Sequence, residues 1–337
     1  MTQKSKQPCH YAGLTRLSRI FADRNCAAWR LDPWKSILHP NGEGENGYDL
    51  LGCVNNLTLF RSRLRRPSYR GSQMNKSLLT AALLVAISPV ASAQTNVSTD
   101  PLVTRRGWEL GAQISDYRYE EPTVGAKIWG PRVGATAAYT FTSARHWFFK
   151  VDGRFAYGSL KYEGSGTKDS VPDSILETRA VLGKDFLPRS GVSLSPFVGL
   201  GYRYLYNDLR GPTSTGAVGY QRYSNYLYAP LGLTSRIKVN GPWVFAPTLE
   251  YDYFIKGRQQ TQFTDLAQGY SDATNTQNKG YGYRISMIAE KGSWAFGPWV
   301  HYWNIENSDI VPIGFGVRGF EPKNETWEYG LEVKYRF

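Results

Sequence analysis

The chain has 337 residues, 14% of them aromatic, and a formal net charge of +12 from 40 Lys and Arg against 28 Asp and Glu. The positive charge is uneven: residues 1–73 hold 12 Lys and Arg against 5 Asp and Glu, whereas residues 94–337 have a net charge of only +4. The long carboxyl-terminal part therefore argues against nucleic acid as a partner. All three cysteines precede residue 54, which excludes a Cys-based zinc site or a thiol nucleophile from the rest of the chain.

An export signal lies inside the chain rather than at its first residue. Met74 and Lys76 begin a short basic region, residues 78–90 are mostly apolar, and residues 91–93 read Ala-Ser-Ala, a small-x-small cleavage site. The apolar run has about a dozen residues, fewer than the roughly 20 that a membrane-spanning helix needs. Cleavage is expected before Gln94, which offers no cysteine for lipidation. The sequence thus predicts three parts: 1–73, the signal peptide 74–93 and the mature chain 94–337.

The segment 1–73 precedes the export signal. We interpret it as an upstream extension without a folded role, such as a misannotated start, and a long cytosolic leader is the alternative. Its basic run from Arg61 to Arg70 could in principle bind nucleic acid or a membrane surface. That run would be absent from the exported chain, so it does not bear on the function of residues 94–337.

From Gly107 onward, apolar residues recur at every second position, which is the period of a strand with two different faces. In residues 327–337, one face is wholly apolar and the other is polar or charged. A two-sheet sandwich and a barrel with its apolar side outward share this period. Strand length separates them, because sandwich strands run about five or six residues and these are about twice as long, as a tilted membrane crossing requires.

The alternating segments number ten, and their connections are short and long in turn. Short turns on one rim and long polar loops on the other are typical of a transmembrane barrel with both termini on the short-turn side. The predicted strands are 107–119, 129–142, 146–158, 174–186, 192–206, 222–239, 242–257, 280–290, 293–306 and 325–337. The predicted long loops are 120–128, 159–173, 207–221, 258–279 and 307–324. The expected fold is an all-β, antiparallel, up-and-down transmembrane β-barrel with short periplasmic turns and long extracellular loops.

Aromatic residues give a second indication of membrane crossing, because their amphipathic rings prefer the membrane interface. Four tryptophans, Trp108, Trp147, Trp243 and Trp294, stand at the short-turn ends of odd-numbered strands. A general preference of aromatics for strands would not place tryptophan at the same end each time. A second girdle is predicted near the long loops, formed by Trp129, Tyr157, Tyr204, Tyr253, Tyr283, Tyr302 and Trp327.

On these grounds, residues 74–337 resemble bacterial outer-membrane barrel proteins of the small porin-like and surface-antigen type. The last residues, Leu-Glu-Val-Lys-Tyr-Arg-Phe, contribute to the resemblance. Their alternation, with Leu331, Val333, Tyr335 and Phe337 on one face, resembles the terminal signal that the barrel assembly machinery reads in this family. The resemblance implies residence in the cell outer membrane after export to the periplasm, with no particular activity.

The face opposite the lipid carries nearly balanced acids and bases. Buried charges are tolerated only when they are paired, hydrogen-bonded or wet, and a ten-stranded barrel is narrow. We therefore predict a lumen network of ion pairs that fills much of the interior, with a narrow conducting path as the alternative. Its expected members are Arg132, Lys150, Asp152, Arg154, Glu177, Arg179, Arg203, Glu250, Asp252, Arg284, Glu332 and Lys334.

Catalytic equipment is sparse in residues 94–337. An omptin-like protease would need paired carboxylates and an Asp-His couple at the outer rim, but the only histidines are His146, beside a short turn, and His301. His301 points inward by its alternation, and Asp252 could approach it only across the barrel or through water. The Gly-x-Gly pairs lack the context of a nucleotide site, and Asp169 with Asp173 lacks a spaced calcium-ligand series. No cofactor or metal is expected.

The sequence thus favours a non-enzymatic outer-membrane barrel. Loops on a rigid scaffold commonly carry binding functions, so its extracellular loops are expected to contact lipopolysaccharide, outer-membrane lipid or an unknown extracellular ligand. The first alternative is a narrow porin-like channel for ions or small solutes. The second is an omptin-like hydrolase at the rim.

Overall fold

The structure, a computed structural model, describes residues 100–337. The predicted signal peptide 74–93, its cleavage site and the upstream segment 1–73 lie outside these residues. Within the described part, no helix is both long and apolar enough to cross a membrane.

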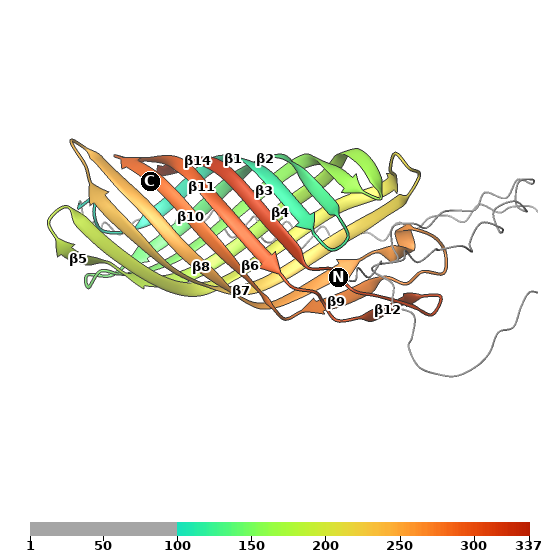
Figure 1. The fold of residues 1–337 in the computed structure, drawn as a ribbon. Helices are drawn as coiled ribbons and strands as arrows, with labels where there is room; N and C mark the ends of the chain where they lie inside the picture. Colours follow the sequence, from blue (N-terminus) through green and yellow to red (C-terminus); the bar gives the residue numbers. More distant parts are fainter. Residues whose placement is uncertain (1–99) are drawn as a thin grey trace, which may run out of the picture.

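Ten long antiparallel strands form a closed barrel (Figure 1). Each strand pairs with its neighbour in the chain, and the ring closes where the first strand pairs with the last, for example Ile114 with Leu331. The strands are β1 (Gly107–Glu121), β2 (Ala126–Thr142), β3 (Trp147–Gly164), β4 (Gly166–Lys184), β6 (Val192–Pro212), β7 (Val218–Lys238), β8 (Trp243–Thr261), β10 (Gly280–Lys291), β11 (Trp294–Ile305) and β14 (Asn324–Arg336). The predicted number of strands and their up-and-down order are confirmed.

Several segments predicted as loops belong to strands. β3 and β4 remain paired up to Gly164 and Gly166, and β6 and β7 up to Pro212 and Val218. These extensions carry few apolar residues on their outer face, while Leu160, Val171 and Leu209 are buried on the inner face. The sequence pattern of a lipid-facing strand is therefore weak there, although the backbones still pair. Four short strands complete the described part: β5 (Phe186–Arg189), β9 (Ala273–Gln277), β12 (Val311–Gly314) and β13 (Val317–Gly319), with one 3-10 turn at η2 (Phe263–Asp265).

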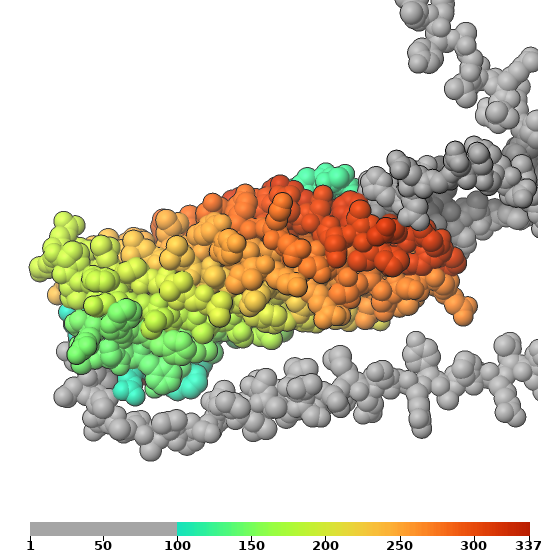
Figure 2. All heavy atoms as spheres, turned by 90° about the horizontal axis from the view of Figure 1, so that it is seen from below, coloured from blue at the N-terminus to red at the C-terminus, as the bar shows by residue number. Residues whose placement is uncertain are grey.

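The two ends of the barrel differ. Short turns, β5 and the carboxyl terminus lie at one end, called here the short-turn end, and β9 and β12 project at the other, the long-loop end (Figure 1). In the space-filling view, the strands from β8 to β14 form one continuous outer wall (Figure 2). Strand residues that face outward at mid-height are apolar and exposed, such as Val133 (63%), Leu231 (60%) and Leu249 (60%). An exposed apolar belt of this kind is the lipid-facing surface of a transmembrane barrel.

Aromatic side chains border this belt at both ends. Trp108, Trp147 and Trp294 are exposed at the short-turn end. At the long-loop end, Tyr302 packs on Trp327 with ring centroids 4.5 Å apart, and Trp327 stacks on Tyr329. The carboxyl-terminal row continues the apolar belt on β14, where Leu331, Val333, Tyr335 and Phe337 all face outward and are exposed.

Candidate functional site in the barrel lumen

The charged residues predicted for the lumen lie on its inner wall but in two different environments. Arg132, Arg203 and Asp252 are at most 1% exposed. The other nine line a cavity in the half of the barrel nearer the short-turn end, some at its floor and some along its sides; they are Lys150, Asp152, Arg154, Glu177, Arg179, Glu250, Arg284, Glu332 and Lys334.

The cavity floor is a set of ion pairs that crosses the lumen. Arg154 on β3 binds Glu177 on β4 at 2.7 Å and Glu328 on β14 at 2.9 Å. From the other side, Arg284 on β10 binds Glu177 at 2.5 Å and Asp252 on β8 at 2.6 Å. Strands from opposite parts of the ring are thereby joined through one carboxylate, that of Glu177. Together with Arg132, which pairs with Asp173 and lies 3.6 Å from Glu328, these residues are called the central layer.

Aromatic groups fill the remaining space of the central layer. The Tyr228 hydroxyl donates to Glu177 at 2.6 Å and accepts from Arg284 at 2.9 Å. Arg203 makes no ion pair among residues 100–337; instead its guanidinium lies 5.2 Å from the Trp303 ring centre, a cation–π arrangement. The alternation pattern placed Arg203 in the lumen but could not show that its partner there is an aromatic ring.

An apolar layer lies directly beyond Glu177, Asp252 and Arg284 of the central layer, toward the long-loop end. Several members lie two residues nearer the long-loop end than a residue of the central layer on the same strand, as Ile175 does relative to Glu177 and Phe254 relative to Asp252, and Tyr228 contributes to both layers. The cluster comprises Ala156, Ile175, Leu205, Tyr226, Tyr228, Phe254, Trp303 and Ile305, none more than 8% exposed. Hydrated ions would have to pass the buried charges of the central layer and the apolar layer to cross the barrel.

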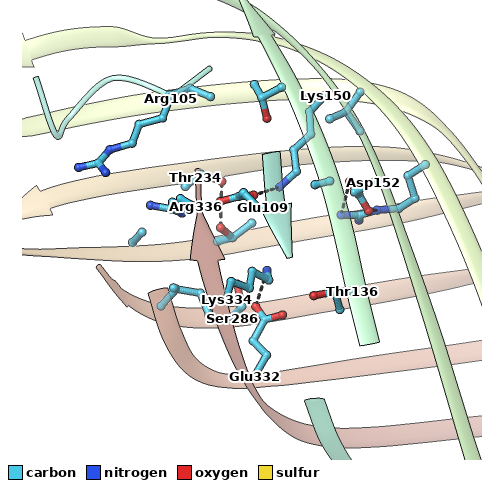
Figure 3. Close-up of a pocket in the computed structure, with 18 of the residues that line it drawn as sticks. Arg105, Glu109, Thr136, Lys150, Asp152, Thr234, Ser286, Glu332, Lys334 and Arg336 are labelled. Carbon is cyan, nitrogen blue, oxygen red and sulfur yellow. Dashed lines mark hydrogen bonds and ion pairs between the residues drawn. The ribbon is translucent and has the colours of Figure 1, made fainter. Parts of the chain in front are cut away.

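Toward the short-turn end, the lumen opens into a cavity of about 530 Å³ (Figure 3). Its sides carry local pairs: Lys150 binds Glu109 at 3.1 Å, and Lys334 binds Glu332 at 2.8 Å. The Lys150 side chain is 26% exposed. These side chains are more exposed than those of the central layer, so we expect each pair to contribute less to stability than a pair there.

The residues before β1 extend across the short-turn mouth of this cavity. The Ser193 hydroxyl donates to the Leu102 carbonyl at 2.6 Å, and Asp185 accepts hydrogen bonds at 2.8 Å from both the backbone N–H and the hydroxyl of Thr104. Arg105 then donates to the Gly292 carbonyl. This segment, residues 100–106, is called the strap. No periodicity marks it in the sequence, and only the fold reveals its position.

Residues considered for catalysis are not assembled into a catalytic group. His301 lies in the cavity wall, with its ring centroid 4.4 Å from that of Trp299. Asp252 binds Arg284 rather than His301, and His146 sits in the tight turn before β3 with a positive φ of 62°. No group of three or more metal-ligating side chains occurs among the described residues.

The long-loop end holds a separate buried cluster. Arg222 binds Glu121 at 2.9 Å and also Glu321, which belongs to the segment between β13 and β14. The Tyr119 hydroxyl donates to Glu121 at 2.6 Å. Burial, reinforced by the charge of Glu121 and opposed by Arg222, raises the pKa of Glu321 to about 7. This cluster fastens the last long loop over the barrel.

Comparisons with known proteins bear on the fold alone. No protein-family model matches the chain, and no curated protein matches it. Among solved structures, the chain is similar to the outer membrane protease OmpT from Escherichia coli, with 10% identity and a TM-score of 0.47 over 69% of this chain and 96% of that one. It is also similar to Ail, the attachment invasion locus protein of Yersinia pestis, with 11% identity and a TM-score of 0.27 over 68% of this chain and 99% of that one. A mutant of the monoaromatic hydrocarbon channel TodX is similar as well, with 10% identity and a TM-score of 0.34 over 69% of this chain and 91% of that one.

Proposed function

We propose that this transmembrane barrel resides in the bacterial outer membrane as a non-enzymatic, non-conducting protein that binds partners through its extracellular hairpins. The observation that carries the proposal is the burial of the central layer and of the apolar layer, whose side chains fill the lumen between the cavity and the long-loop end. A lumen filled in this way makes the barrel a scaffold, and its exposed ends then become the surfaces available for function.

The strand extensions support a binding role at the long-loop end. Beyond the aromatic girdle, β3 and β4 continue as a paired hairpin whose turn at Ser165 is fastened to the neighbouring hairpin, since Thr213 and Thr215 both donate to the Ser165 carbonyl. Paired backbone and contacts between hairpins make these projections more rigid than free loops. Rigid projections present side chains to a partner at low entropic cost.

The proposed location requires export and assembly. We place signal cleavage before Gln94, which amino-terminal sequencing of membrane-extracted protein would test; recovery of peptides from residues 1–73 on the exported protein would contradict it.

We also propose that the barrel assembly machinery reads the terminal row that ends at Phe337. Deleting residues 335–337 should then lower the amount of assembled barrel more than deleting three residues from 265–275, and equal yields would contradict that role.

The experiment that tests the closed scaffold is single-channel recording of the purified barrel in planar bilayers. The proposal predicts no steady openings. Steady conductance in the native protein would instead support a narrow channel, for which the cavity of about 530 Å³ would form one vestibule. In that case, ion selectivity should shift when Arg179 or Glu250, a pair 2.7 Å apart in the cavity wall, is neutralised.

A further inference from the structure

Basic side chains project from the outer wall just beyond the aromatic girdle at the long-loop end. Most of them are neutralised by an acid close by. The pairs are Arg118 with Asp116 (2.9 Å), Lys127 with Glu120 (3.4 Å), Arg210 with Asp208 (2.7 Å) and Lys323 with Glu306 (3.2 Å). The outer wall therefore carries little net charge over most of its circumference.

One sector differs. Lys256 and Arg258 on β8 and Lys279 just before β10 are exposed, and none of them has an acidic partner among residues 100–337. They are neighbours, because Arg258 is in register with Thr276 on β9, the short strand that leads to Lys279. Glu306 lies opposite Lys279, but its carboxylate binds Lys323. Lys256, Arg258 and Lys279 are together called the cationic triad.

A strand irregularity directs the triad outward. The pairing of β7 with β8 skips one residue, since Leu227 pairs with Lys256 but Tyr228 pairs with Phe254. Ile255 and Lys256 are consequently both exposed, whereas strict alternation would have turned one of them into the lumen. Bulges that re-aim a side chain are common at functional positions of sheets. Here the bulge places an unpaired cation on the outer wall.

The triad stands at the level of lipid headgroups. Directly below it, Tyr253 is 61% exposed. Tyr251 and Tyr283 lie with ring centroids 5.4 Å apart, and Tyr281 lies 5.5 Å from Tyr283. Such tyrosine bands mark the boundary between hydrocarbon and headgroups. The cationic triad, which lies immediately beyond this boundary, can therefore interact with charged groups of the lipid headgroups.

We propose that Lys256, Arg258 and Lys279 bind the phosphate groups of a phosphorylated glycolipid in the outer leaflet. An arginine fork matches two phosphate oxygens, and lysines add point charges around it. The tyrosines below would contact the upper acyl chains of the same lipid. This inference rests on the proposed outer-membrane location and names one partner class for the barrel's outer wall, separate from the partner of the hairpins.

The test measures how tightly the full-length barrel, folded in phosphatidylcholine nanodiscs, binds added lipid A. Lys256→Gln with Arg258→Gln should weaken binding by at least about tenfold, since each basic residue near a membrane surface contributes roughly fivefold. The matched control is Lys161→Gln on β3, an exposed lysine in register with Trp129 that makes no ion pair among residues 100–337. This control should leave binding within about twofold of the native value.

Three outcomes would overturn the proposal: unchanged binding in the double variant, an equal loss in the Lys161→Gln control, or displacement of lipid A by millimolar inorganic phosphate. The last result would show a site for free phosphate rather than for a lipid. Cell fractionation is done in parallel. Absence of the protein from the outer membrane would refute the proposed location, whereas the nanodisc result depends only on the triad.

Discussion

The two halves of the lumen carry similar residues in different surroundings. In the central layer, Arg154, Glu177 and Arg284 are at most 9% exposed, and each has at least two ion-pair partners, one on an adjacent strand and one on a non-adjacent strand. In the cavity, the Lys150 and Lys334 side chains are 26% and 22% exposed, and each makes one ion pair among residues 100–337, with Glu109 and Glu332 respectively. The alternating pattern is the same in both halves, so the charge pattern alone does not determine whether a lumen is open or closed.

Side-chain volume explains the difference. Inside the barrel, large rings lie over glycines of the neighbouring strand: a Cβ at Gly330 would come within 2.3 Å of the Trp299 ring, and one at Gly201 within 2.2 Å of the Tyr228 ring. Around the cavity, small side chains such as Thr136, Thr248 and Ser286 face the lumen and leave space. The filled half is instead occupied by bulky side chains, since Trp303, Arg132, Arg203 and Tyr228 are the largest fully buried side chains among residues 100–337.

The largest expected effect comes from removing a central cation. Arg284→Met should lower the free energy of unfolding by about 3–5 kcal/mol, because Glu177 and Asp252 would remain buried without their shared partner. Lys150→Met, the matched change in the cavity, should cost at most about 1 kcal/mol. Urea unfolding in detergent micelles measures both, and equal losses would erase the distinction between the two halves.

The next largest effect is the difference in stability cost between an arginine introduced on the lipid-facing side of β7 and one introduced on its cavity-facing side. Leu231→Arg should cost about 2–4 kcal/mol, since this side chain faces lipid near the membrane centre. Thr234→Arg should cost much less, because Thr234 lines the cavity. The heat-modifiable, folded fraction on gels gives the comparison. Similar losses would mean that the inner and outer faces of β7 are assigned wrongly.

A smaller effect concerns the strap that covers the cavity. Asp185→Ala removes the acceptor of three hydrogen bonds, from the Thr104 N–H, the Thr104 hydroxyl and the Ser195 hydroxyl. The strap should detach while the barrel persists, so trypsin should cut after Arg105 or Arg106 several-fold faster. Asp169→Ala, at an exposed position near the other end, serves as the control and should leave the cutting rate unchanged.

The smallest effect is a pH dependence at the long-loop end, outside both halves of the lumen. Because the pKa of Glu321 is raised from its ordinary 4.5 to about 7, the folded state holds this proton more tightly than the unfolded state. The stabilisation is fully present below pH 4.5 and is lost as the pH rises toward 7. Hydrogen exchange in residues 307–323, corrected for intrinsic rates, should be slower at pH 5 than at pH 8. Glu321→Gln should remove the difference, and a persistent difference would assign it to another group.

The sequence predicted the strands of the barrel wall better than the contacts inside the barrel. Alternation located all ten strands, since a belt such as Leu331 to Phe337 must face lipid. It missed the extensions of β3 and β6, whose outer faces carry no apolar row, although Leu160 and Leu209 are buried on their inner faces. It also missed the strap and the Trp303 partner of Arg203, because these contacts join positions far apart in the chain, and only the closed ring brings them together.

The most direct test of the closed lumen is thiol labelling from each side of the membrane. With Cys9, Cys26 and Cys53 replaced by Ser, Thr248→Cys places a single thiol in the cavity wall, and Asp169→Cys places one near the long-loop end. A small, membrane-impermeant thiosulfonate added to intact cells should label Asp169→Cys but not Thr248→Cys. After the outer membrane is permeabilised, Thr248→Cys should become labelled from the periplasmic side. Equal labelling of both thiols in intact cells would demonstrate a continuous path through the barrel and contradict the closed lumen.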